Sequence, residues 1–388
     1  MRILACTTAG TGHFLPMAPV LGSCAEAGHD VVVACPASFA STAADAGFAV
    51  APFDDAKPDE WGAVMSRLPG LPPDEANRIV VQEVFGRIDT AAALPRLAAR
   101  FQQERPELVL RDPAEFASWV LAQRWGVPTA RVSIGLLSLE PRWAEAAIAG
   151  IGDVVEEGTL DAAALAGGHV VAAAPATFDP AGDTVEVYRY RGPAVLDSEP
   201  PSLPEGDAPL VYVTLGTVAA SLGVWPSAYR AILEGLEELD VRVLVTTGAQ
   251  VDPSDLGALP AGVTVIRFVP QDAVLARAAV MVAHGGFGTV LGGLRAGVPM
   301  ALVPLFADQS YNAARVAEVG AGVVLPTSFD PRVVPAELPD AVRSAVGELL
   351  DDAKVRAASA MLAEEIATHP PVGALTATLE KIATQAHN

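Results

Sequence analysis

Short runs of β-branched and other apolar residues alternate with longer amphipathic stretches along most of this chain, and the alternation occurs twice. In the first half, Ile3–Thr7 and Val31–Ala34 are predicted strands on either side of a helix over Leu15–Ala27. In the second half the pattern starts again, with predicted strands at Leu210–Thr214 and Arg242–Thr246. This alternation is typical of β-α-β units, which form parallel sheets with helices on both faces. The chain is therefore predicted to form two doubly wound, Rossmann-like α/β domains.

A segment rich in proline, glycine and acidic residues, about Gly192–Pro209, separates the two halves. The 388 residues are also too many for one ordinary core. We expect a first domain over residues 1–200, which includes this linker, a second over 201–370, and a last helix within 371–388. If the two domains face each other, a ligand would bind in the cleft between them, at the carboxyl ends of the strands.

Charge and cysteine content limit the partners of the chain. A net charge of −21 disfavours nucleic acid and an anionic membrane surface, because both need a basic face. The three cysteines, Cys6, Cys24 and Cys35, have no CxxC spacing, so neither a disulfide framework nor a zinc site is expected. No apolar run of the sequence is long enough to cross a bilayer. We therefore expect a cytoplasmic protein; whether it forms a homodimer stays open.

A glycine-rich turn follows a predicted strand in the second half, His284-Gly285-Gly286-Phe287-Gly288-Thr289. Glycines let the backbone approach a ligand closely, and the helix expected after them offers unpaired N–H groups to an anion. Thr289 adds a hydroxyl and His284 an imidazole. Together these groups can bind a diphosphate without lysine or arginine. Taken alone, the turn could also be an ordinary surface loop.

Further motifs surround this turn. Phe268-Val269-Pro270-Gln271 precedes it; Gly297-Val298-Pro299 and Ala307-Asp308-Gln309, followed by Asn312-Ala313, come after it. As a set, these motifs resemble the family 1 glycosyltransferases of GT-B fold, particularly the bacterial branch that glycosylates antibiotics and other natural products. The resemblance also covers the amino-terminal turn and the order of the two domains. It implies a GT-B fold, a nucleoside-diphosphate sugar as co-substrate, no further cofactor, and a last helix that crosses back onto the first domain.

The resemblance implies roles for single residues. Phe268–Gln271 would hold the nucleoside base, and Asp308 with Gln309 would bind hydroxyls of the donor sugar. The donor diphosphate would be bound by His284, Gly285, Gly286, Thr289, Thr217 and Gly12. An alternative for Asp308 is an N-cap of a helix.

The turn Gly10-Thr11-Gly12-His13-Phe14-Leu15 follows the first predicted strand. Leu15 stands where a dinucleotide-binding motif needs its third glycine, which weakens an NAD-binding interpretation. In the resembled family this turn carries the catalytic base, which corresponds to His13. A neutral imidazole can take the proton of an acceptor hydroxyl as that oxygen attacks the anomeric carbon.

The family often orients this histidine through a carboxylate that follows a later strand, and Asp112 holds the corresponding position. Such a carboxylate would fix the imidazole tautomer and stabilise the imidazolium as it forms. However, Asp112-Pro113-Ala114-Glu115 also has the pattern of a helix capping box, with Asp112 at the N-cap. A carboxylate has two oxygens, so one residue could serve both roles.

The acceptor pocket is expected in the first half, where apolar side chains suit a small hydrophobic acceptor. Candidates are Trp61, Met65, Leu68, Phe85 and the segment Leu136–Ala149. Apolar residues at helical spacing are also what an ordinary core requires. The identity of the acceptor therefore stays open.

The expected reaction is a direct displacement with inversion at the anomeric carbon. Because no two aspartates have D-x-D spacing, the leaving-group charge would fall on the turn at His284 and not on a metal. The bacterial branch favours thymidine over uridine diphosphate. Three alternatives stay open: a GT-B nucleotide-sugar epimerase or hydrolase, a non-catalytic helper of a true transferase, and an NAD(P)-dependent oxidoreductase.

Overall fold

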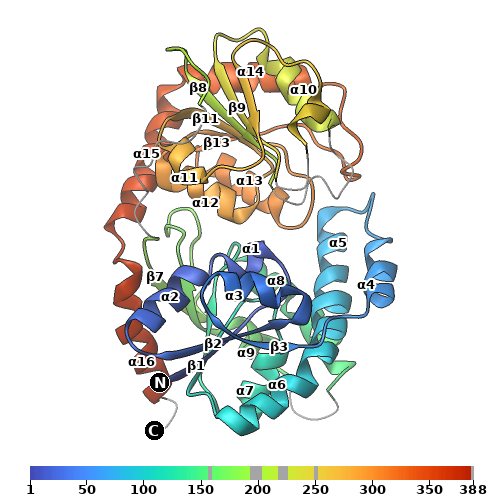
Figure 1. Cartoon of the computed structure of the whole chain (residues 1–388), viewed down its shortest axis with the longest axis vertical. Helices are drawn as coiled ribbons and strands as arrows, with labels where there is room; N and C mark the ends of the chain where they lie inside the picture. The colour runs from blue at the N-terminus through green and yellow to red at the C-terminus, as the bar shows by residue number, and fades with distance from the viewer. Residues whose placement is uncertain (156–159, 193–202, 217–225, 249–251, 386–388) are drawn as a thin grey trace. The chain divides into compact units, whose positions relative to one another are not determined.

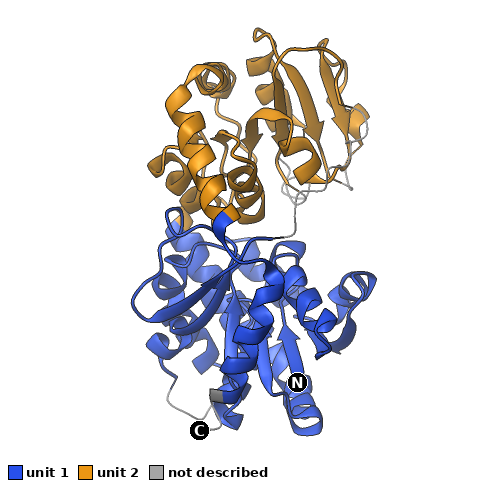
Figure 2. Ribbon diagram, turned by 90° about the vertical axis from the view of Figure 1, so that its left-hand side faces the viewer, with its two compact units in different colours: residues 1–68, 74–193, 368–388 blue, residues 69–73, 194–367 orange. Residues whose placement is uncertain are grey.

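The computed structural model describes residues 1–155, 160–192, 203–216, 226–248 and 252–385. The chain divides into two compact units, coloured separately in Figure 2. The first unit comprises residues 1–68, 74–193 and 368–388, and the second comprises residues 69–73 and 194–367. Each unit contains one parallel sheet with helices packed on it (Figure 1), as the alternating pattern of the sequence predicts.

The sheet of the first unit has seven strands in the order β3-β2-β1-β4-β5-β6-β7. Their bounds are β1 Arg2–Cys6, β2 Asp30–Pro36, β3 Ala49–Phe53, β4 Leu108–Arg111, β5 Thr129–Val132, β6 Gly168–Ala172 and β7 Val185–Arg189. Alternate residues of β1 enter two different cores, because Ile3 packs on one face of the sheet and Leu4 on the other. A strand buried on both faces needs an uninterrupted apolar run, and β1 has one.

The helices of the first unit differ from the predicted ones in their bounds. They are α1 Thr11–Phe14, α2 Ala18–Glu26, α3 Ala40–Asp45, α4 Pro58–Met65, α5 Pro73–Ile79, the π-helix η2 Val80–Asp89, α6 Thr90–Glu104, α7 Ala117–Trp125, α8 Leu139–Gly152, α9 Ala162–Ala166 and α16 Leu375–Gln385, with short 3₁₀ turns at Ala37–Phe39 and Val372–Ala374. The helix predicted over Leu15–Ala27 is α2, which begins three residues later, at Ala18. The short helix α1 precedes it, and Pro16 lies between the two.

The sheet of the second unit has six strands in the order β10-β9-β8-β11-β12-β13. They are β8 Leu210–Thr214, β9 Arg242–Thr246, β10 Val263–Ile266, β11 Ala278–Ala283, β12 Met300–Leu302 and β13 Gly322–Val324. The helices are α10 Ser227–Leu236, η4 Pro253–Leu256, α11 Gln271–Leu275, α12 Phe287–Ala296, α13 Gln309–Glu318, α14 Leu338–Asp351 and α15 Ala353–Thr368. Its main core lies between the sheet and α10 with α14.

Both sheets are extended on both sides of their first strand. Strand β1 lies between β2 and β4, and β8 lies between β9 and β11. The connections that leave neighbouring strands therefore run in opposite directions after β1 and β4, and again after β8 and β11. This reversal opens a crevice at the carboxyl ends of the strands, where ligands bind in folds of this kind. The turns that carry His13 and His284 follow β1 and β11.

The last helix, α16, belongs to the first unit. Its apolar residues Leu375, Leu379 and Ile382 are buried in the core that also contains residues of α2 and β1. At its surface, Nε2 of His29 lies 3.3 Å from a carboxylate oxygen of Glu380. This contact gives His29 a structural role in the turn between α2 and β2.

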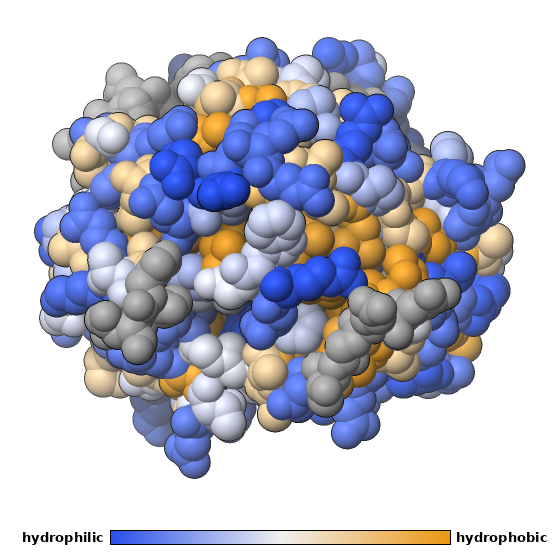
Figure 3. Space-filling view, turned by 90° about the horizontal axis from the view of Figure 1, so that it is seen from below, coloured by the Kyte–Doolittle hydropathy of each residue, from blue (hydrophilic) through white to orange (hydrophobic). Residues whose placement is uncertain are grey.

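In the part of the chain that the structure describes, no helix is both long and apolar enough to cross a membrane. The face drawn in Figure 3 shows hydrophilic residues interspersed with smaller apolar areas.

The π-helix η2 packs closely on α8. A β-carbon built on Gly150 of α8 would lie 1.9 Å from the main-chain oxygen of Gln82, which no side chain could tolerate. On the facing side, a β-carbon built on Gly86 would lie 3.0 Å from the oxygen of Ala147. The two glycines allow the backbones of η2 and α8 to come into direct contact.

This contact predicts that Gly150→Ala lowers the free energy of unfolding by at least about 1–3 kcal/mol, because the added methyl overpacks two backbones. Gly152→Ala, two residues further along α8, is the matched control, since its β-carbon would meet only a leucine methyl at 4.0 Å. Alanine there should leave stability equal or raise it by up to about 1 kcal/mol through helix propensity. Chemical denaturation of both variants tests this, and equal stabilities would contradict the packing.

Candidate functional site

The first part of the candidate site is the turn after β1. The N–H of His13 donates to the carbonyl of Gly10 (3.2 Å), which opens the short helix α1. The His13 side chain is 24% exposed, and its Nδ1 lies 3.3 Å from Oδ1 of Asp112. Asp112 directly follows β4, the strand that pairs with β1. The reversal of strand order therefore brings His13 and Asp112 together, although 99 positions separate them in the sequence.

The Asp112 carboxylate is fully buried and receives hydrogen bonds on both oxygens. Oδ1 accepts from the N–H groups of Ala114 (2.7 Å) and Glu115 (3.1 Å). Oδ2 accepts from the N–H of Thr8 (2.8 Å) and the hydroxyl of Thr7 (3.0 Å). Burial by itself raises the pKa of Asp112, but His13 and the N–H donors outweigh it and lower that pKa below its usual value. The carboxylate is therefore held ionised beside the imidazole.

The capping-box interpretation of Asp112-Pro113-Ala114-Glu115 is wrong in its detail. Helix α7 begins at Ala117, with Phe116 at its N-cap position. Asp112 instead closes a turn ahead of the helix, and Glu115 accepts from the N–H of Ser118 (3.1 Å). Pro113 stands four residues before the first residue of α7, and the N–H groups of Ala114 and Glu115 donate to the Asp112 carboxylate.

A group near His13 that the sequence did not single out is Asp89, at the end of the π-helix η2. Burial, and then the charge of Asp112, raise the pKa of Asp89 to about 7, and the charge of His13 lowers it in part. On the same helix, the ring of Phe85 meets the imidazole of His13 edge-on, with 5.7 Å between ring centroids. Residues four apart on a helix lie on one face. The apolar residues of Val80–Asp89 have helical spacing, but nothing in the sequence distinguishes a π-helix from an α-helix there.

The other acceptor candidates lie on elements that pack around η2. Trp61, which is 44% exposed, and half-buried Met65 belong to α4, which packs against η2. Leu136 is buried ahead of α8, the helix that forms the Gly150 contact with η2. Among the acceptor candidates, Phe85 contacts the ring of His13 directly.

The second part of the candidate site is the turn after β11, where His284 packs against two glycines. A β-carbon on Gly216, after β8, would lie 2.7 Å from Nε2 of His284, and one on Gly286 would lie 2.5 Å away. Only glycine fits at either position. The ring hydrogen-bonds to the main chain of Thr214, and Nδ1 is buried without a partner among the described residues.

Burial lowers the pKa of His284 to about 4, so this imidazole is neutral at pH 7. A neutral imidazole carries a single N–H. Most of the charge on a bound diphosphate would therefore have to be met by main-chain N–H groups of the turn and by hydroxyls.

The residues proposed to hold the base are anchored to α12. The ring of Phe268 is 72% exposed, whereas Val269 next to it is buried. Pro270 stands at the N-cap position of α11, and the amide of Gln271 donates to the main-chain carbonyl of Thr289 in α12 (3.1 Å). The side chain of Gln271 is thus used inside the protein, and the exposed Phe268 ring offers a flat apolar surface.

Asp308 and Gln309 stand at the start of α13. Asp308 occupies the N-cap position but makes no capping hydrogen bond with its side chain; instead its Oδ2 accepts from Nδ2 of Asn312 (2.8 Å). The side-chain oxygen of Gln309 accepts from the N–H groups of Leu305 (2.8 Å) and Phe306 (3.2 Å). That oxygen is therefore already used to hold the segment before the helix.

Two further predicted diphosphate ligands are less informative. Thr217 lies outside the described residues. Gly12 lies in α1, where an added β-carbon would meet no other atom within 4 Å. Among the residues that the structure describes, no group of three His, Cys, Asp or Glu side chains is placed to hold a metal ion.

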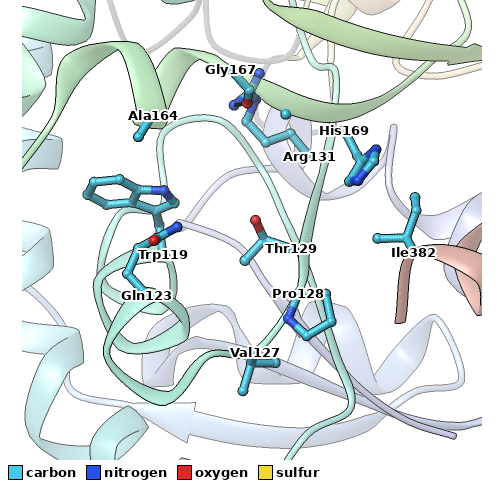
Figure 4. Close-up of a pocket in the computed structure, with 11 residues that line it drawn as sticks. Trp119, Gln123, Val127, Pro128, Thr129, Arg131, Ala164, Gly167, His169 and Ile382 are labelled. Carbon is cyan, nitrogen blue, oxygen red and sulfur yellow. Dashed lines mark hydrogen bonds between the residues drawn. The ribbon is translucent and has the colours of Figure 1, made fainter. Parts of the chain in front are cut away.

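The pocket in Figure 4 lies away from these groups, with a volume of about 380 Å³. Thr129 and His169, which line it, stand at the amino ends of β5 and β6, the sheet edge opposite His13. Its Arg131 guanidinium already donates to the carbonyls of Leu165 (2.6 Å) and Ala166 (2.7 Å). It also pairs with Glu140 (2.7 Å). With its cation neutralised, this pocket offers little to an anionic ligand.

Comparisons with known proteins give a consistent identification. Residues 230–382 match the family described as "Erythromycin biosynthesis protein CIII-like, C-terminal domain". The L-demethylnoviosyl transferase of Streptomyces niveus is 32% identical over 390 residues, which cover 95% of each chain. The oleandomycin glycosyltransferase of Streptomyces antibioticus is 28% identical, over 89% of this chain and 83% of that one.

Solved structures agree in fold. CalG4, the calicheamicin glycosyltransferase, matches with a TM-score of 0.80 and 25% identity over 98% of both chains. VinC, a glycosyltransferase solved in complex with dTDP, matches with a TM-score of 0.73 and 23% identity over 99% of this chain and 100% of that one. The chain therefore belongs to the family 1 glycosyltransferases of GT-B fold, in the branch that acts in bacterial natural-product biosynthesis.

Proposed function

We propose that this glycosyltransferase moves a sugar from a nucleoside diphosphate, thymidine in preference to uridine, to a hydroxyl of a small apolar acceptor, with inversion. The observation that carries the proposal is the imidazole of His13 beside the buried carboxylate of Asp112, at 3.3 Å. The preference for thymidine is supported by two structural neighbours, VinC and SsfS6, which were solved with thymidine diphosphate.

In this mechanism His13 is the general base. Asp112 orients the imidazole through Nδ1, which leaves Nε2 to accept the proton of the acceptor hydroxyl. As that proton arrives, the ionised carboxylate stabilises the imidazolium. The acceptor oxygen bonds to the anomeric carbon while the bond to the diphosphate oxygen breaks on the opposite side. The phenyl edge of Phe85 forms one wall beside the base, which suits an apolar acceptor.

The second unit binds the donor in this proposal. Phe268 would pack against the base, the turn at His284–Thr289 would bind the diphosphate, and Asp308 would bind sugar hydroxyls. Because the donors are a neutral imidazole, main-chain N–H groups and a hydroxyl, the departing charge is met by fixed dipoles. We propose that these dipoles stabilise the leaving group in place of a divalent metal. A GT-B epimerase or hydrolase stays the second candidate, and donor turnover without acceptor would favour it.

His13→Ala should lower kcat by about 10²- to 10⁴-fold, because a positioned base contributes that much. Affinity for the nucleoside diphosphate should stay within a factor of two. The measurement is sugar transfer to a phenol or macrolactone acceptor selected with the wild type, beside calorimetry with the diphosphate. His169→Ala, on β6, is the matched control and should keep full activity. Normal activity of His13→Ala would refute the proposed base.

Asp112→Asn should lower both activity and stability. Hydrogen-bond donors face both oxygens of the Asp112 carboxylate. In asparagine an NH₂ group replaces one of these oxygens, so in either orientation this NH₂ group faces another donor. We expect a loss in kcat of at least about 10²-fold and a loss in unfolding free energy of about 1–3 kcal/mol. Denaturation and transfer assays on one sample separate the two effects. Full activity together with lower stability would leave Asp112 a purely structural residue.

The pKa of about 7 at Asp89 predicts a pH effect. Above this pH the Asp89 carboxylate is charged and favours the imidazolium form of His13. Asp89→Asn removes that charge, so the acid limb of the kcat/KM profile should move to lower pH, by roughly 0.5–1 unit, and the plateau should fall. The exposed Asp59→Asn on α4 is the control. A profile identical to the wild type would show that Asp89 does not act on His13.

The first measurement is calorimetry of the wild type with thymidine diphosphate, uridine diphosphate and NAD(P), without added metal. We expect one pyrimidine diphosphate to bind, and His284→Ala to weaken it at least about tenfold, since a lost hydrogen bond to a charged group has that effect. Binding of NAD(P) alone, or of no nucleotide, would overturn the proposed donor site.

A further inference from the structure

Asn312 of α13 lies fully buried between two elements of the proposed donor site. Its Nδ2 donates to the main-chain carbonyl of Gly285 (3.0 Å) and to Oδ2 of Asp308 (2.8 Å). An amide nitrogen has two hydrogens, so both are used. One side chain thereby connects the turn expected to bind the diphosphate with the carboxylate expected to bind the sugar.

The orientation of this amide is forced. Its Oδ1 is buried without a hydrogen-bond partner among the described residues. Turning the amide over would place Oδ1 against a carbonyl oxygen and a carboxylate oxygen, which repel it. The protein therefore leaves one acceptor unsatisfied in order to keep both donors engaged. Aspartate, leucine and alanine at this position would each lose both bonds.

The bond to Gly285 controls the direction of a neighbouring N–H group. In a planar trans peptide the carbonyl of Gly285 and the N–H of Gly286 point in opposite directions. Because Asn312 holds that carbonyl, the N–H of Gly286 must point away from Asn312. Gly286 is the N-cap residue of α12, a helix of ten residues whose first N–H groups lack partners within the helix. This N–H is one of the main-chain donors on which diphosphate binding would depend, since His284 is neutral.

The second bond of Asn312 restrains the Asp308 carboxylate. Its acceptor is a charged oxygen, so the bond is stronger than one between neutral groups. The segment in front of Asp308 is held independently, because the side chain of Gln309 accepts from the N–H groups of Leu305 and Phe306. With the backbone fixed by Gln309, the remaining freedom of Asp308 is in its side chain, which Asn312 restrains.

We propose that Asn312 is a positioning residue that sets the diphosphate turn and the sugar-binding carboxylate relative to each other, so that nucleoside diphosphate and sugar are bound as one rigid donor. This inference rests on the proposed function. It predicts that Asn312 affects the affinity for the nucleotide through Gly285, independently of Asp308.

The test compares Asn312→Ala with Asp308→Asn by calorimetry, using the preferred nucleoside diphosphate and its glucose derivative as probes. Asp308→Asn keeps an acceptor oxygen for Asn312, so the diphosphate should bind as in the wild type and only the nucleotide sugar should bind less tightly. Asn312→Ala should lower the affinity for the diphosphate itself by about 10-fold and the affinity for the nucleotide sugar by about 100-fold, since it removes the bonds to both Gly285 and Asp308. Asn312→Asp should resemble Asn312→Ala or be weaker still, because its charge repels Asp308.

Ser310→Ala, on the same helix, is the control and should bind both probes normally. Circular dichroism and thermal melting report whether each variant folds; if Asn312→Ala does not, Asn312→Ser replaces it, since a hydroxyl can reach only one of the two acceptors. Unchanged diphosphate affinity in a folded Asn312 variant would overturn the inference. Failure of the wild type to bind either probe would instead overturn the proposed function.

Discussion

A parallel strand can be followed by another only through a crossover, and a crossover leaves the sheet in one of two directions. Both units of this protein use both directions: the strands that follow β1 and β8 are added on one side, and β4 and β11 with the strands after them are added on the other. The point of reversal is where the carboxyl ends of two neighbouring strands are free of covering connections. His13 with Asp112 occupies that point in one sheet, and His284 with Gly216 occupies it in the other. The placement of the chemical groups thus depends on strand order before it depends on any single contact.

At both points the protein holds its polar groups with hydrogen bonds and little net charge. Asp112 remains ionised in a fully buried position because His13, main-chain N–H groups and a threonine hydroxyl surround it. If the His284 turn binds a diphosphate, as proposed, it has the opposite requirement, since it must attract an anion in a chain with a net charge of −21. Fixed N–H dipoles suit this setting, because they act at short range and do not depend on the overall field of the protein.

Most of the strands and the order of the two halves could be predicted from the sequence, because buried parallel strands leave uninterrupted apolar runs. The positions of the two turns, after the first strand and after the strand that ends at Ala283, could also be predicted, because glycine-rich stretches directly follow those apolar runs. Other features had no signal. The residues Val80–Asp89 have a helical pattern that does not distinguish a π-helix from an α-helix, and the cap-like pattern at Asp112 is followed by a helix only from Ala117. Asn312 belonged to a recognised motif, but its role requires knowing that Gly285 and Asp308 lie on either side of it.

The close contact between η2 and α8 has a consequence for exchanging segments between related enzymes. Phe85 contacts the ring of His13 from a helix that packs directly on the backbone of α8. In a chimera that received only the loop and helix around Phe85, α8 would come from the other parent. A side chain at position 150 of that α8 would clash with the backbone of η2. The two helices therefore have to be exchanged together, as residues 80–89 with residues 139–152, if the backbone contact between them is to be kept.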